Sequence, residues 1–161
     1  MKSDLTKGMF LMSTAVFLAQ LLATGVMIGV IWVVQLVHYP LFASVGANEF
    51  VAYHREHVRL ITFIVGPAML IELGSAVYLL ANPISPIPRW AILLGLVMIG
   101  VAWLTTALAS VPMHDQLSAG FVDLAHQKLV FTNWIRTFAW SGRGVLLFWM
   151  AWTLLEQRAA V

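Results

Sequence analysis

Long apolar runs decide what this chain can fold into. Four stretches consist mainly of hydrophobic side chains, and they cover Met9–Val37, Arg59–Ala81, Trp90–Val111 and Leu129–Leu155. Each reaches or exceeds the ~20 residues that a helix needs to cross a bilayer core of ~30 Å. Inside a bilayer every backbone group has to be satisfied within the protein, so long uninterrupted apolar runs predict helices rather than a barrel.

The composition belongs to the same class. Of 161 residues, 61% are hydrophobic and 10% are charged, against roughly 45–50% and 25% in soluble domains. We therefore predict an all-α integral membrane protein, an antiparallel bundle of four transmembrane helices forming one domain over residues 1–161. The predicted spans are residues 9–42, 49–81, 88–114 and 122–157, and short loops make neighbouring spans antiparallel. The third helix is expected to break at Pro112, because a proline disfavours helical geometry at the preceding residue.

The same composition excludes several kinds of site. The chain has no cysteine, which rules out disulfides, thioether-linked haem, thiolate metal sites and iron–sulfur clusters. Any metal must be held by nitrogen and oxygen. The net charge is only +2 and there is no basic run, so nucleic acid is not an expected partner. The expected partners are the lipid bilayer and a hydrophobic small molecule, with a homo-oligomer or a larger membrane complex left open.

Histidines gather at one face of the predicted bundle. In an antiparallel arrangement the end of the first helix, the start of the second, the end of the third and the start of the fourth meet at one membrane face. All five histidines lie at these places: His38, His54, His57, His114 and His126. Three or four neutral imidazoles suit a transition metal such as iron, copper or zinc. The five histidines therefore form a candidate metal centre, with histidines that merely tolerate the interface as the alternative reading.

Two refinements follow from the positions of these histidines. His57 points along its helix toward the bundle and is expected to matter more than His54, which we place one turn nearer water. A haem b needs only two axial histidines, for example His57 and His126. Because haem would leave three histidines unexplained, we favour a non-haem metal and keep haem b as the alternative.

A second set of candidate residues lies on the fourth predicted helix. Asn133, Thr137, Trp140 and Gly144 follow His126 by 7, 11, 14 and 18 residues, so they share one stripe of a helix that runs inward from the histidines. We predict that Asn133, Thr137 and Trp140 contact a bound cofactor or substrate.

Two arginines, Arg136 and Arg143, interrupt this apolar helix. An arginine within a membrane is costly and usually faces the bundle or a wet cavity, where it has a partner. Glu72 lies 13 residues and Arg143 lies 14 residues from the same face, so a rise of ~1.5 Å per residue predicts an ion pair between them. Arg136 is closer to the histidines and is a candidate to bind an oxygen-rich substrate or a haem propionate. Tyr53 and Asp115 are candidate proton donors.

Two short segments resemble a known group of membrane proteins. The segments "VPMHDQL" and "TNWIRTFAW" are similar to the Pro-x-Asn-x-x-Leu loop and the Asn-x-x-Arg helix of the anthrone-oxygenase-like four-span proteins. The matching positions are Pro112, Leu117, Asn133 and Arg136, and His114 stands where that group has asparagine. The resemblance implies oxygenation of a polycyclic phenolic substrate.

These features lead to one expected function and one alternative. We expect a membrane oxidoreductase or oxygenase with a histidine-ligated metal, acting on a lipid-soluble aromatic or quinone-like substrate. The alternative is a non-catalytic membrane subunit or a protein that handles metal or haem. Lys2, Lys7, Arg89 and Arg158 flank the spans on the face away from the histidines. The positive-inside rule therefore predicts cytoplasmic termini and a histidine cluster toward the outer face.

Overall fold

The described part of the chain is helical. The structure is a computed structural model that describes residues 2–159, with side chains for residues 7–157 and 159. Its elements are α1 (Lys2–Val33), the π turn η1 (Val34–His38), α2 (Tyr39–Leu41), the 3-10 turn η2 (Phe42–Ser44), α3 (Ala47–Ala81), α4 (Arg89–Thr105), the π turn η3 (Thr106–Ser110), α5 (Val111–Leu117) and α6 (Asp123–Ala159). No strand occurs among these residues, so the all-helical prediction is confirmed. Met1, Ala160 and Val161 belong to the predicted domain but lie outside the described residues.

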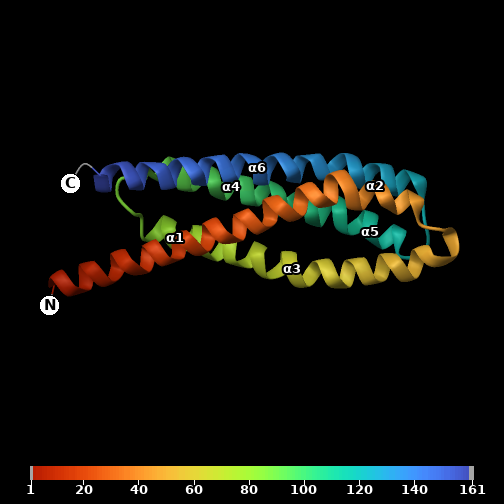
Figure 1. The fold of residues 1–161 in the computed structure, drawn as a ribbon, viewed down its shortest axis with the longest axis horizontal. Helices are drawn as coiled ribbons and strands as arrows, with labels where there is room; N and C mark the ends of the chain where they lie inside the picture. Colours follow the sequence, from red (N-terminus) through yellow and green to blue (C-terminus); the bar gives the residue numbers. More distant parts are fainter. Residues whose placement is uncertain (1, 160–161) are drawn as a thin grey trace.

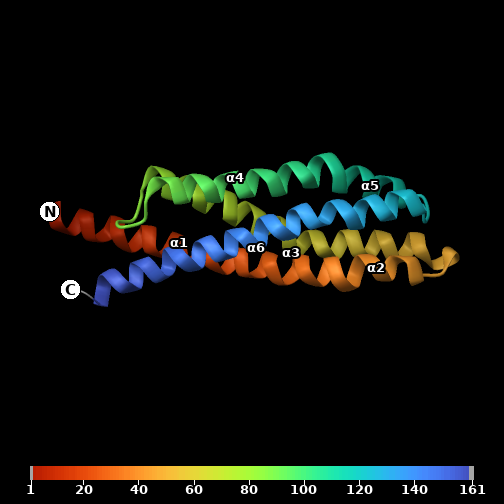
Figure 2. The ribbon, with the colours of Figure 1, turned by 90° about the horizontal axis from the view of Figure 1, so that it is seen from above.

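The long helices lie side by side along one axis (Figures 1 and 2). α1 packs against α3 and α6, and α4 packs against α6 and α3. Both termini lie at one end of the molecule, and the junctions between α2 and α3 and between α5 and α6 lie at the other end (Figure 1). The four helix ends that carry the histidines therefore meet, as the alternation of the apolar runs predicted.

Three of the helical segments are long and apolar enough to cross a membrane. They are Lys7–Ser44, Ala47–Ala81 and Arg89–Leu117. α6, which covers the fourth predicted span, is not among them. The reason lies in its buried face, where Asn133, Arg136, Thr137 and Arg143 replace apolar side chains.

A π turn precedes each of two prolines near the histidine end. η1 runs directly into the "YPL" of α2, and η3 runs directly into the "VPM" of α5. A proline lacks the N–H that a regular helix needs and its ring crowds the carbonyl four residues back, whereas a π turn relaxes the local pairing. The predicted break at Pro112 is therefore wrong. Val111 keeps helical angles (φ −58°, ψ −52°), and the helix continues to Leu117.

The apolar core extends along the whole length of the molecule. One cluster of buried side chains, around Phe17, Leu79 and Leu147, lies toward the ends of the chain, and another includes Met27 and Trp140. At the histidine end, buried aromatic and aliphatic side chains surround Tyr39, His54 and His126: Phe42, Phe50, Leu117, Ala125 and Leu129. Between these clusters, buried polar side chains form the site described next.

Candidate functional site

Four of the five histidine rings are in contact. The ring centroids of His38 and His57 are 4.5 Å apart, those of His54 and His114 are 5.2 Å apart, and those of His57 and His114 are 5.9 Å apart. Nε2 of His54 lies 2.9 Å from Nδ1 of His114, within hydrogen-bond distance. Residues from η1, α3 and α5 thus form one group of imidazoles, which we call the histidine cluster (His38, His54, His57, His114).

His126 stands apart from this cluster. Its Nε2 donates a hydrogen bond to the backbone carbonyl of Tyr39, at 2.7 Å. Its ring neighbours are Phe42 and Phe121, with centroids 6.4 and 5.2 Å away. His126 therefore connects the start of α6 to the start of α2, whereas the sequence analysis grouped it with the other four imidazoles.

Within the described residues, no three histidine, aspartate or glutamate side chains are arranged so that they could hold a metal ion. The nearest nitrogen pair in the cluster is the one between His54 and His114, 2.9 Å apart. A metal centre built from His38, His54, His57, His114 and His126 consequently stays a prediction.

Tyr39 connects the histidine cluster to α6. Its hydroxyl lies 3.0 Å from Nε2 of His114 and accepts a hydrogen bond from the Arg136 guanidinium at 3.2 Å. Arg136 also donates to Oδ1 of Asn133 and, at 3.3 Å, to the Thr106 hydroxyl. One chain of polar contacts thus runs from α3 through α5 and α2 to α6.

The predicted stripe on α6 faces the interior. Asn133, Thr137 and Trp140 are buried. Asn133 donates to Oε1 of Gln35 at 2.8 Å, and the Thr137 hydroxyl donates to the carbonyl of Asn133 at 3.0 Å. Asn133 and Thr137 therefore hold Arg136 and Gln35 in place, while Trp140 is the member of the stripe that reaches the cavity described below.

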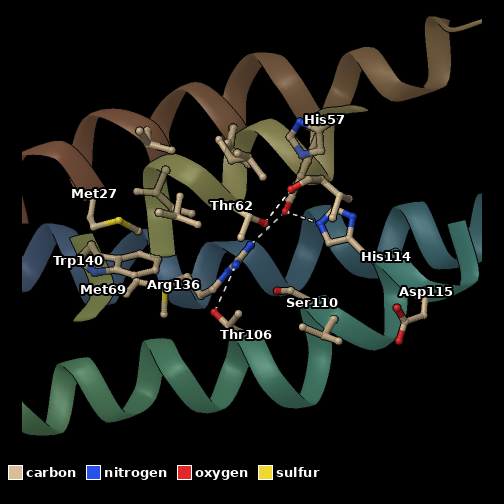
Figure 3. Close-up of a pocket in the computed structure, with 18 residues that line it drawn as sticks. Met27, His57, Thr62, Met69, Thr106, Ser110, His114, Asp115, Arg136 and Trp140 are labelled. Atoms are coloured by element: carbon tan, nitrogen blue, oxygen red, sulfur yellow. Dashed lines mark hydrogen bonds between the residues drawn. The ribbon is translucent and has the colours of Figure 1, made fainter. Parts of the chain in front are cut away.

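A cavity of about 210 Å³ lies between α1, α3, η3, α5 and α6 (Figure 3). Its polar lining consists of Tyr39, His57, Thr62, Thr106, Ser110, His114, Asp115 and Arg136, and most of the remaining wall is aliphatic. Trp140 and Met69 close the end away from the histidines. The cavity thus places two imidazoles and one guanidinium beside a space suited to an apolar molecule.

Two polar atoms on this wall have no hydrogen-bond partner within the described residues. They are Oγ of Ser110 and Nε of Arg136. Both side chains are more than nine-tenths buried, at 2% and 8% exposed, and Figure 3 shows both at the cavity. A buried polar group without a partner is costly, so these two atoms are the unsatisfied donors of the cavity wall within the described residues.

The two predicted proton donors lie farther out. Tyr53 is 37% exposed and stacks on His38, with ring centroids 6.2 Å apart. It lines a shallow outer groove together with His38 and His57 rather than the cavity. Asp115 lines the cavity but is exposed, and Figure 3 shows it beyond Ser110 as seen from Arg136.

The predicted ion pair between Glu72 and Arg143 is confirmed. Nε of Arg143 lies 3.2 Å from Oε1 of Glu72, and both side chains are 1% exposed. Thr24 donates to Oε1 of Glu72 at 2.5 Å and the Trp140 indole donates to Oε2 at 2.9 Å. Because Trp140 also lines the cavity, the ion pair supports one end of the cavity wall.

The sequence interpretation missed Tyr39, Thr106 and Ser110. Thr106 and Ser110 precede His114 by eight and four residues, so the sequence shows three polar side chains at similar spacing. The sequence does not show which way they face, because the π turn η3 covers Thr106–Ser110. The position of Tyr39 could not be predicted for the same reason, because η1 changes the helical register just before it.

The chain was compared with protein-family models, with curated proteins and with solved structures, and no match was found in any of the three comparisons.

Proposed function

We propose that this protein is a membrane-embedded oxidoreductase or oxygenase that acts on a lipid-soluble aromatic or quinone-like molecule. One observation carries the proposal: a single cavity is lined by His57, His114 and the buried guanidinium of Arg136 in an otherwise mainly aliphatic wall. Such a site takes an apolar ring and offers hydrogen bonds to its oxygen atoms. In this proposal Arg136 and Tyr39 orient the oxygen and His114 exchanges a proton with it.

The proposal includes a membrane bundle of four spanning helices. The segments Lys7–Ser44, Ala47–Ala81 and Arg89–Leu117 have the length and hydropathy for it. α6 supports a fourth span in a different way, because Arg136 and Arg143 are buried while many of its outward side chains are apolar. The exposed residues of α6 include Phe131, Phe138, Val145, Phe148, Trp152 and Leu155, a surface that suits lipid contact.

The histidine cluster is the proposed metal centre. Imidazole nitrogens suit iron, copper or zinc, and contact distances of 4.5–5.9 Å between ring centroids bring the four rings around one small region. A haem b fits less well. The cavity volume of 210 Å³ is about 1.4 times the ~150 Å³ of a cavity that binds benzene. A porphyrin has four pyrrole rings and is therefore too large for this cavity. When bound, the metal would supply electron transfer or oxygen binding beside the substrate.

The resemblance to anthrone-oxygenase-like proteins supports a phenolic substrate. The cavity favours a phenol smaller than the polycyclic substrate that the resemblance implies. Two of its matching positions, Asn133 and Arg136, are hydrogen bonded to each other at the cavity. The cavity volume favours one or two rings over a polycyclic molecule.

The test combines metal analysis with turnover. We expect the purified protein to hold stoichiometric metal and either to oxidise a short-chain quinol or to reduce the corresponding quinone, with a change in its visible spectrum. Ligands bind metal in their deprotonated form, so occupancy should fall as the pH is lowered into the range in which the imidazoles of the cluster become protonated. His114→Ala should lose metal and turnover, whereas His126→Ala serves as a matched control because its ring lies outside the cluster. Absence of quinone turnover in metal-loaded protein would refute the proposed enzyme.

A second candidate is a non-catalytic protein that handles metal. The contact between His38 and His57 favours it, because both rings line the outer groove and offer a path for an ion from the surface. Stoichiometric metal that leaves readily to a chelator, together with no turnover, would identify this function.

A further inference from the structure

We propose that the cavity binds an apolar molecule that carries one oxyanion, a phenolate or a carboxylate, whose negative charge neutralises Arg136. The inference rests on the proposed function in taking the cavity as the substrate site, and it adds the charge and size of the substrate. It holds for a bound ligand whether or not the ligand is turned over.

Within the part of the chain that the structure describes, Arg136 is a buried cation without an acidic ion-pair partner. Its hydrogen-bond acceptors are the hydroxyls of Thr106 and Tyr39 and the amide oxygen of Asn133, all of which are neutral. The ion pairs within the described residues join Arg59 to Glu56 and Arg143 to Glu72. An uncompensated buried charge is strongly destabilising, so a counter-ion from outside the chain would complete the site.

Arg143 provides the comparison within the same helix. It lies seven residues further along α6 and is neutralised by Glu72 at 3.2 Å. The two arginines differ in their surroundings: Arg143 packs against the α4 backbone, donating to the Gly95 carbonyl at 2.9 Å, whereas Arg136 faces the cavity. Among the described residues, Arg143 thus has a buried acidic partner away from the cavity lining, whereas Arg136 lines the cavity and has no ion-pair partner.

Two free hydrogen-bond donors lie on the cavity wall. Nε of Arg136 and the hydroxyl of Ser110 have no partner within the described residues. A carboxylate can accept from both with its two oxygens, and a phenolate can accept from both with one. Hydrogen bonds from an ionised group to an oxyanion are among the stronger ones in proteins. The free donors therefore match the missing charge.

The rest of the cavity sets the size and orientation of the ligand. Met27, Ile31, Val65 and Met69 give an apolar wall, and about 210 Å³ holds one ring with a short substituent. Asp115 is exposed at the edge of the cavity, and its charge disfavours an oxyanion there. The ligand head consequently lies inward at Arg136 and Ser110, and its apolar end lies against the aliphatic wall.

The test compares a charged ligand with a neutral one of the same shape. Binding of 4-butylbenzoate and of its methyl ester is measured by calorimetry on the full chain in detergent. We expect the acid to bind at least tenfold more tightly than the ester. Arg136→Gln should remove this preference, and Ser110→Ala should weaken acid binding several-fold. Arg59→Gln is the matched control, because Arg59 is exposed and does not line the cavity. The pair 4-nitrophenol, which is ionised in mildly alkaline buffer, and 4-nitroanisole repeats the comparison for a phenolate and tells the two oxyanion sources apart.

Equal affinity for acid and ester, or an unchanged preference in Arg136→Gln, would overturn the inference. If Arg136→Gln does not fold, the inference is tested with Ser110→Ala and Arg136→Lys. Ser110→Ala should weaken acid binding, and Arg136→Lys should retain the preference for the acid because lysine keeps the positive charge. The inference and the proposed function fail separately. Tight acid binding without turnover refutes only the enzyme, and turnover of a neutral quinone by a protein with no preference for the acid refutes only the oxyanion.

Discussion

Glu72 is the residue on which the interior of the molecule depends most. Its carboxylate accepts hydrogen bonds from Thr24 on α1, Trp140 on α6 and Arg143 on α6. One side chain of α3 therefore joins three helices. The ion pair between Glu72 and Arg143 lies in a low-dielectric interior, where its stability depends on well-aligned hydrogen bonds. Loss of either residue would leave the charge of the other without compensation.

We expect Glu72→Gln to destabilise the protein by about 3–5 kcal/mol. The double variant Glu72→Leu/Arg143→Leu should recover most of this loss, because it removes both charges. Thermal unfolding in detergent measures both effects. Glu56→Gln is the control, because its partner Arg59 is exposed and a surface pair contributes little. Equal unfolding midpoints for Glu72→Gln and wild type would contradict the expectation.

The sequence predicted this ion pair but not the full wall of the cavity. Counting residues from a common face located Glu72 and Arg143 at one depth, because α3 and α6 are regular between those points. Counting fails across η1 and η3, since a π turn adds about one residue per turn and rotates everything beyond it by roughly 100°. Tyr39 lies directly after such a turn and could not be placed.

His54 shows a second limit of the sequence. It was expected to lie nearer water than His57, yet it is 1% exposed. Phe42 and Phe50 cover its ring, with centroids 5.7 and 5.6 Å away. That cover comes from the turn between α2 and α3, whose path the apolar pattern does not determine.

At the scale of elements, the contact between α4 and α6 depends on one glycine. A Cβ on Gly95 would lie 2.7 Å from NH1 of Arg143. The guanidinium cannot easily move aside, because it is held by the Gly95 carbonyl at 2.9 Å and by Glu72 at 3.2 Å. The glycine thus lets the two helices approach around a buried arginine.

We expect Gly95→Ala to destabilise the protein by about 1–3 kcal/mol through overpacking. Gly100→Ala is the matched control on the same helix, because nothing lies within 4 Å of its Cβ position, and alanine there should be neutral or stabilising by up to about 1 kcal/mol. Unfolding midpoints of the two variants in detergent give the comparison. A Gly95→Ala protein as stable as Gly100→Ala would show that Arg143 is free to move.

For the whole molecule, the proposed membrane placement allows two orientations, which differ in the face that is cytoplasmic. The termini lie at one end and the histidine cluster near the other (Figure 2). Four basic residues belong to the end with the termini: Lys2, Lys7, Arg89 and Arg158. Three belong to the other end: Arg55, Arg59 and Lys128. The side chains of Lys2 and Arg158 are not among those that the structure describes. The excess of one basic residue favours cytoplasmic termini.

We expect a reporter that is active only in the cytoplasm to work when fused after Val161. The same reporter inserted at Gly120, in the loop before α6, should be inactive, and a periplasmic reporter should give the opposite pattern. A C-terminal fusion active only outside would reverse the predicted orientation. Activity of one reporter at both positions would contradict the four-span topology.

The division of polar residues among the helices also determines how the chain has to be assembled in a cell. The three most apolar segments are synthesised first and α6 last. An arginine at the centre of a lone inserted helix costs about 2.5–3.5 kcal/mol, and α6 carries two of them in its buried face. On the proposed membrane placement, Glu72, Tyr39 and Thr106 are already in the bilayer when α6 leaves the ribosome. The last helix therefore enters the membrane as a partner of the earlier helices rather than by its own affinity for lipid.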